Sequence, residues 1–141
     1  MNKKRFEILI RRADDALTGK IKDDRGNVIA GKVNILNVQT CSIKDSYNGQ
    51  TAALGVTIAM TGLLPALAIY QKQTDDCDKM QILNAIALMM NVGMEAEKPG
   101  EDLFRYMLNC SEEQLKKYKK EIIDCAIALK QVIRTYKLVK S

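Results

Sequence analysis

The feature that most constrains the fold of this chain is an uncharged stretch that runs from Ser46 to Gln71. About 20 apolar residues are enough to span a bilayer, so this length first suggests a transmembrane segment at residues 52–70. The stretch, however, contains Asn, Gln, Thr and several glycines, and its large aliphatic side chains are few. A central helix that is buried among its neighbours fits this content better. We expect Pro65 to kink that helix, because proline cannot donate a hydrogen bond to the carbonyl of Thr61.

The segments around this stretch show the spacing of further helices. Apolar residues recur at helical intervals in four of them, residues 3–17, 80–92, 101–109 and 112–139. Asp78 with Gln81, and Ser111 with Gln114, have the spacing of a capping box before a helix. The methionine-rich helix after Asp78 is expected to be core, although such a surface can also form a binding groove. The chain is therefore predicted to be an all-α single-domain bundle of about five to six helices over residues 1–141, with the Ala/Gly-rich helix buried at its centre and a long basic helix at its C-terminus.

Three segments lack a helical pattern. Residues 19–31 have a turn-rich centre with short apolar flanks, which is typical of a short hairpin or a flexible loop. Residues 32–45 fit an extended stretch or a short helix equally well. Residues 74–78 form a polar break before the methionine-rich helix.

The chain contains no histidine, and this excludes several classes of site. Ser-His-Asp and Cys-His catalysis need an imidazole base, and most catalytic zinc sites need a histidine ligand. None of the four cysteines forms a Cys-x-x-Cys pair, so we expect reduced thiols that pack as small hydrophobic groups. No residue constellation points to an enzyme that uses Glu or Lys as its base. The sequence thus predicts a cytoplasmic protein without metal, cofactor or catalytic activity, and the basic N-terminus lacks the apolar core of a secretory signal.

The positive charge is concentrated at the two ends of the chain. Residues 1–12 hold five basic residues and one acidic residue, and residues 111–141 hold eight and four, although the net charge of the whole chain is only +5. Placed on a helical wheel at about 100° per residue, the C-terminal cations share one stripe. This stripe consists of Lys116, Lys119, Lys120, Lys130, Arg134 and Lys137. Cations on a merely soluble helix are usually interspersed with acids, so their sorting suggests a surface that is covered.

Two apolar residues, Ile123 and Ile127, project into the same cationic stripe and are candidates for a subunit contact. A polyanion is a natural partner, because cations that bind phosphates release counterions. The acidic patch of a partner protein fits nearly as well, and a solvated face that keeps the protein soluble is the third interpretation. Aromatic residues are few and arginines are not clustered, so any contact with nucleic acid is expected to involve the backbone, without sequence preference.

Residues 43–47 read Ile-Lys-Asp-Ser-Tyr, and residues 57–70 carry a Thr-Gly-Leu-Leu-Pro element inside an alanine-rich helix that ends in Tyr70. A basic helix with a serine cap follows at the C-terminus. This combination, over about residues 43–139, resembles the small helical subunit of type III-B CRISPR effector complexes, the fifth Cmr protein. Residues 57–70 are the specific part of the likeness.

The resemblance implies a non-catalytic subunit that stacks with its own copies beside the crRNA-bearing backbone of the complex. Such subunits line the channel that holds crRNA and single-stranded target RNA, while other subunits cut. Lys44, in the lead-in, is expected on this basis to contact RNA. The six cations of the stripe are predicted to bind RNA from the helical wheel alone, with Ile123 and Ile127 as candidates for self-stacking. The alternative is a helical adaptor whose basic face binds an acidic protein.

Overall fold

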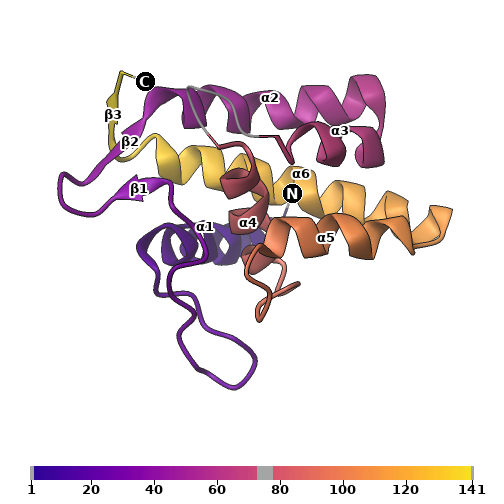
Figure 1. Cartoon of the computed structure of the whole chain (residues 1–141), viewed down its shortest axis with the longest axis horizontal. Coiled ribbons are helices and arrows are strands. Elements are labelled where there is room, and N and C mark those ends of the chain that lie inside the picture. The colour runs from indigo at the N-terminus through magenta and orange to yellow at the C-terminus, as the bar shows by residue number, and fades with distance from the viewer. Residues whose placement is uncertain (1, 73–77, 141) are drawn as a thin grey trace.

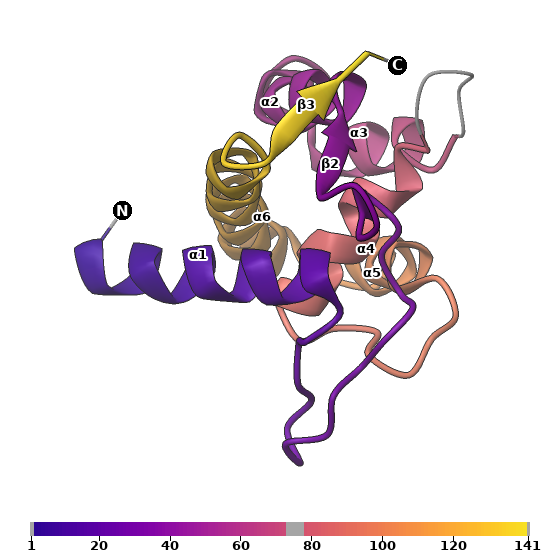
Figure 2. The same cartoon turned by 90° about the vertical axis from the view of Figure 1, so that its left-hand side faces the viewer.

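The computed structural model describes residues 2–72 and 78–140, and within these ranges it contains six α-helices and a small sheet (Figures 1 and 2). The helices are α1 (Lys3–Thr18), α2 (Asp45–Thr61), α3 (Leu63–Ile69), α4 (Met80–Met89), α5 (Pro99–Leu108) and α6 (Glu112–Ile133). The strands are β1 (Leu36–Asn37), β2 (Ser42–Lys44) and β3 (Lys137–Val139), in the order β1-β2-β3. The predicted helical fold is therefore confirmed, and the sheet is an addition to it.

Helix α4 lies at the centre of the bundle. Every residue of α4 except Gln81 is buried, and the helix packs against α1, α5 and α6 (Figure 2). Its closest neighbour is α5, because a side chain at Gly100 would place its Cβ only 2.6 Å from the Cβ of Leu83. The amide of Gly100 donates to the buried Asn84 side chain at 2.8 Å, which satisfies that polar group. The methionine-rich segment is thus core, as predicted.

The uncharged stretch departs from its predicted form in two ways. It is not one kinked helix, because the chain breaks at Gly62 between α2 and α3. Gly62 has φ 93° and ψ 164°, a conformation that side-chain-bearing residues rarely adopt, whereas Pro65 lies in the first turn of α3, where its missing N–H costs little. Nor is α2 buried on all sides: Val56 is 60% exposed and Met60 80% exposed. Only one stripe of α2 faces the core, because small and polar side chains release too little free energy on burial to require neighbours all around.

The segment between α1 and α2 crosses from the first helix to the sheet without forming a helix of its own. Helix α1 ends at Thr18, and its C-capping residue Gly19 has φ 73°. The chain then turns back so that Lys22 and Val28 form an isolated antiparallel bridge. The ambiguous stretch before α2 is extended and supplies β1 and β2. Among the described residues, no helix is both long and apolar enough to cross a membrane.

The two predicted capping signals both form hydrogen bonds at helix starts. The Ser111 side chain accepts from the amide of Gln114, and the Gln114 side chain accepts from the amide of Ser111, which makes a full capping box for α6. At α4, the Asp78 carboxylate accepts from the amide of Met80 at 3.1 Å. The rest of the predicted polar break, residues 74–77, lies outside the described residues.

Candidate nucleic-acid interface

Helix α6 presents a cationic face because most of its apolar residues lie on the opposite side. Ile122, Cys125 and Leu129 are buried against the bundle, as the helical wheel predicts. Burial raises the pKa of the Cys125 thiol to about 12, so this cysteine is an inert core group. The predicted cations of α6 lie on the outer side, where Lys116, Lys119 and Lys120 are exposed and Lys130 is half-buried. Arg134 follows directly as the exposed C-terminal capping residue.

The prediction that Lys137 lies on this helix is wrong. Helix α6 ends at Ile133, and Lys137 is the first residue of β3, which pairs in parallel with β2. The Tyr136 hydroxyl donates to the Asp14 carboxylate at 2.6 Å, which ties the turn after α6 to α1. Burial and this hydrogen bond raise the pKa of Tyr136 to about 12. Pairing with a distant strand thus overrides the helical pattern of the last residues.

The same pairing brings Lys44 to the C-terminal cations. In the register of β2 and β3, Ser42 opposes Lys137 and Lys44 opposes Val139, so Lys44 and Lys137 are diagonal neighbours. Lys137 is itself close to Arg134 in the chain, and Lys130 lies one helical turn before Arg134. We call these four residues, Lys44, Lys130, Arg134 and Lys137, the C-terminal cation group. None of them forms an ion pair with another part of the described chain.

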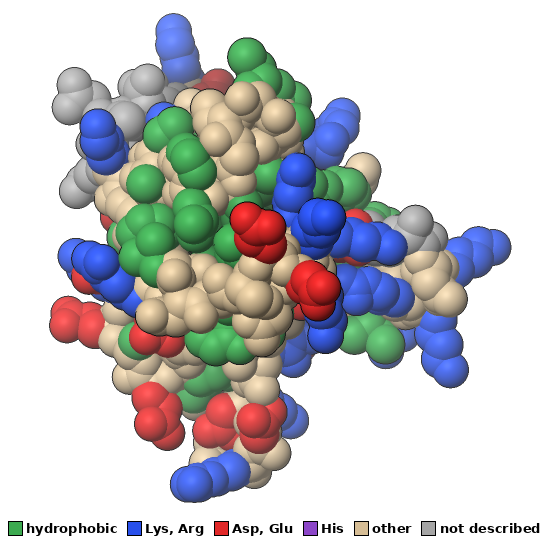
Figure 3. Space-filling view, turned by 90° about the vertical axis from the view of Figure 1, so that its right-hand side faces the viewer, with side chains coloured by type: hydrophobic (Ala, Val, Ile, Leu, Met, Phe, Trp, Pro, Cys, Tyr) green, Lys and Arg blue, Asp and Glu red, His purple; other side chains and the backbone are tan. Residues whose placement is uncertain are grey.

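The remaining predicted cations lie toward the other end of α6, beside an apolar groove. The groove has a volume of about 390 Å³ and is lined mainly by Leu63, Leu64, Pro65 and Leu115, and its charged lining residues are Glu112, Lys116 and Lys119. Figure 3 shows one face of the molecule on which Lys and Arg side chains gather to the right, next to hydrophobic side chains. The six predicted cations therefore do not form one uniform surface.

The two predicted subunit-contact residues differ in exposure. Ile127 is 40% exposed, whereas Ile123 is half-buried and packs against the core. With Lys130 they line a small crevice of about 50 Å³ whose other wall is α2, at Thr51 and Gly55. The crevice is too small for a ligand, so any contact here is with a surface that lies across it.

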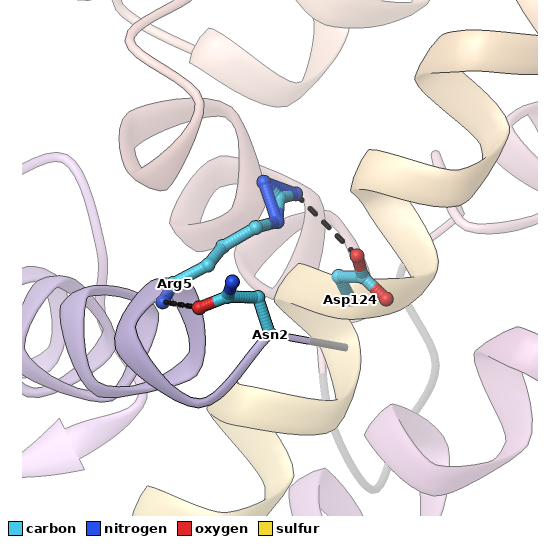
Figure 4. Close-up of polar contacts among 3 residues, drawn as sticks. All are labelled: Asn2, Arg5 and Asp124. Atoms are coloured by element: carbon cyan, nitrogen blue, oxygen red, sulfur yellow. Dashed lines mark hydrogen bonds and ion pairs between the residues drawn. The ribbon is translucent and has the colours of Figure 1, made fainter.

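The basic residues of α1 have a role that the sequence did not reveal. Asn2 caps α1, and Arg5 forms an ion pair with the buried Asp124 of α6 at 3.4 Å (Figure 4). Arg12 donates to the carbonyls of Leu88 and Met89, at 2.7 Å and 2.8 Å. Two arginines of the basic N-terminus thus hold helices together. The sequence signal for this role is helical spacing alone: Arg5 lies four residues before the buried Leu9, and Arg12 lies four residues before the buried Ala16.

Within the described part of the chain, no cluster of three or more Cys, Asp or Glu side chains is placed to hold a metal ion.

Comparison with known proteins identifies the family. The sequence model of the family CRISPR-associated protein (Cas_Cmr5) matches residues 22–136. No curated protein and no solved structure gives a match. Members of this family are generally non-catalytic structural subunits. Because the match covers most of the chain, the protein belongs to the Cmr5 family and is the small subunit of a type III-B CRISPR effector complex.

Proposed function

We propose that this subunit lines the channel for crRNA and target RNA in the effector complex and contacts the RNA backbone through its basic residues. The complex would act in the cytoplasm, in antiviral defence. The contacting residues would be Lys44, Lys116, Lys119, Lys120, Lys130, Arg134 and Lys137. Within this set, we expect the C-terminal cation group to contribute most of the affinity.

The observation that carries this proposal is the unpaired state of the C-terminal cation group. Its four members come from β2, from α6 and its C-terminal capping residue, and from β3. No acidic side chain forms an ion pair with them within the described residues. Acids of α6 lie elsewhere: Asp124 is buried against Arg5 of α1. Cations that stay unpaired on a protein surface can neutralise phosphates and release their counterions.

The test is a charge reversal of three members of the group, Lys130→Glu, Arg134→Glu and Lys137→Glu. We expect the full-length triple variant to bind a short single-stranded RNA at least about tenfold more weakly than the wild type, because about three phosphate contacts are lost. The slope of log affinity against log salt concentration is expected to fall by about 2. Fluorescence anisotropy at several salt concentrations measures both quantities.

The matched control reverses three exposed cations far from the group, Lys20→Glu, Lys22→Glu and Arg25→Glu, which gives the same change in net charge. Circular dichroism verifies that both variants keep their helices. Equal RNA affinity of the triple variant and the wild type would contradict the site assignment. Loss of binding to other complex subunits with RNA affinity unchanged would favour the adaptor function.

A specific observation favours such a protein contact at the other end of α6. The groove between α3 and α6 is apolar, and its charged lining residues are two cations, Lys116 and Lys119, and one acid, Glu112. The excess of one cation fits a partner segment that has an apolar side chain beside a carboxylate. Here the subunit would act as an adaptor. In co-purification with the other subunits, Lys116→Glu with Lys119→Glu should then weaken assembly while RNA binding at the C-terminal cation group persists.

Self-stacking of copies in the complex is the other part of the proposal, with Ile123 and Ile127 at the contact. It is supported by the exposure of Ile127, which helical spacing places in the cationic stripe of α6. Replacing this side chain by a charge, Ile127→Glu, should reduce concentration-dependent association in analytical ultracentrifugation. Unchanged association would exclude this residue from the contact.

A further inference from the structure

A cavity of about 420 Å³ lies beside the small sheet, next to the C-terminal cation group. Three carboxamide side chains line it, those of Asn34, Asn37 and Gln39. Lys44 contributes a positive charge, and Val38 and Val139 contribute apolar surface. None of its described lining residues is acidic. The volume is within the range of about 300–1,000 Å³ that is usual for small-ligand sites.

The strand register explains why these groups come together. Asn37 of β1 opposes Ser42 of β2, Ser42 opposes Lys137 of β3, and Lys44 opposes Val139. Opposed residues, and residues two positions apart on one strand, share one face of a sheet. These five residues therefore lie on the same face, and four of them line the cavity. Lys137 consequently stands beside the cavity, so two cations adjoin it.

The carboxamides of the cavity have free hydrogen-bonding groups. The Asn37 side-chain oxygen accepts from the amides of Gln39 and Thr40, at 3.1 Å and 3.3 Å, which leaves its NH₂ group free to donate. The side chains of Asn34 and Gln39 make no hydrogen bond within the described part of the chain. A carboxamide both donates and accepts, which matches the edge of a nucleobase.

We propose that this cavity holds one unstacked nucleobase of a single-stranded RNA, with the adjoining phosphate against Lys44 and Lys137. The apolar side chains would contact the face of the base, and the carboxamides its edge. A phosphate group alone would need only Lys44 and Lys137 for binding, and the carboxamides would have no ligand group to bind. This inference rests on the proposed RNA-binding function and extends it, because the sequence predicts contacts with the backbone alone.

The test compares two probes with the full chain: a short single-stranded RNA, and a ribose-phosphate chain of the same length without bases. We expect the wild type to prefer the RNA by about tenfold, the scale of one well-placed set of base contacts. The variant Asn37→Asp with Gln39→Ala keeps the acceptor that holds the β1–β2 turn but loses the free donor. It should bind the two probes alike. Asn27→Asp, on the distant hairpin, is the control with the same charge change and should keep the preference.

A second measurement does not depend on any variant. RNA that contains 4-thiouridine is photo-crosslinked to the wild-type chain, and mass spectrometry locates the linked peptide, which we expect within residues 34–44. Crosslinks confined to other residues, or equal wild-type affinity for the two probes, would overturn the cavity assignment while leaving backbone binding intact. If the wild type binds neither probe at low salt, the proposed function itself fails, and the cavity assignment fails with it.

Discussion

The two basic ends of the chain have the same excess of positive charge, but the structure employs them differently. In α1, Arg5 pairs with a carboxylate of α6 and Arg12 with backbone carbonyls at the end of α4. In the C-terminal segment, the cation group is unpaired within the described residues. Of the five basic residues at the N-terminus, Arg5 and Arg12 therefore hold helices together, whereas no member of the C-terminal cation group has such a partner among the described residues.

The difference follows from the position of each segment in the bundle. Helix α1 crosses α6 and also touches α4, so its long side chains reach polar groups on two neighbours (Figure 2). The C-terminal cation group lies where α6 gives way to β3, and its side chains form no ion pair with any described residue. Net charge alone thus does not distinguish a structural cation from a binding one, and mutations can.

The largest effect is expected for Arg12→Ala. This change removes two hydrogen bonds from a charged group to the α4 carbonyls, and we expect it to lower the free energy of unfolding by about 2–3 kcal/mol. Urea denaturation followed by circular dichroism measures the change. RNA affinity, measured at a temperature where the variant is folded, should change less than about threefold.

The matched control is Arg134→Ala, which removes the same residue type from the C-terminal cation group. It should change the free energy of unfolding by less than about 0.5 kcal/mol, because Arg134 is exposed, and should weaken RNA binding instead. Equal losses of stability in the two variants would show that the cations of the two basic ends contribute alike to the fold.

A smaller effect is expected for Tyr136→Phe, which removes a hydrogen bond between the C-terminal segment and α1. Loss of the hydrogen bond to Asp14 should cost about 1 kcal/mol of stability at neutral pH. Because the pKa of Tyr136 in the folded protein, about 12, is above its value of 10.0 in the unfolded chain, its contribution is complete below pH 10 and is lost as the pH rises toward 12.

The pH dependence gives this variant its own signature. Between pH 10 and 12, the wild type should lose more stability than Tyr136→Phe, which has no phenol to ionise at this position. Parallel stability curves over that range would show that the Tyr136–Asp14 contact does not stabilise the fold. Cys125 and Tyr118, whose pKa values are also raised to about 12, titrate equally in both proteins and cancel in the comparison.

Two apolar segments show how far sequence reasoning extends. The methionine-rich α4 was predicted to be core, and it is, because large aliphatic side chains recur all around the helix. The uncharged stretch was predicted to be the buried centre, yet α2 buries only one stripe. The absence of charge permits burial, but only large apolar side chains on every face require it.

The candidate site likewise has a part that could be predicted from the sequence and a part that could not. The sorting of cations on α6 could be predicted, because it depends on helical spacing alone. The position of Lys137 and the proximity of Lys44 could not, since both depend on pairing between strands that are far apart in the sequence. A strand of two or three residues is too short for an alternating pattern of apolar and polar side chains to predict its partner strand.

The local features of this protein follow from the sequence alone: the starts of α1 and α6, the capping box at Ser111, the apolar face of α6 and the excess of cations at both ends. Each of these depends on residues within one or two helical turns. Three further features are set by the tertiary structure. They are the choice of arginines that form contacts between helices, the point where α6 ends before β3, and the common face of the sheet on which Asn37, Lys44 and Lys137 lie. These outcomes depend on contacts between distant segments, whose free energies are set by the whole fold and not by local spacing.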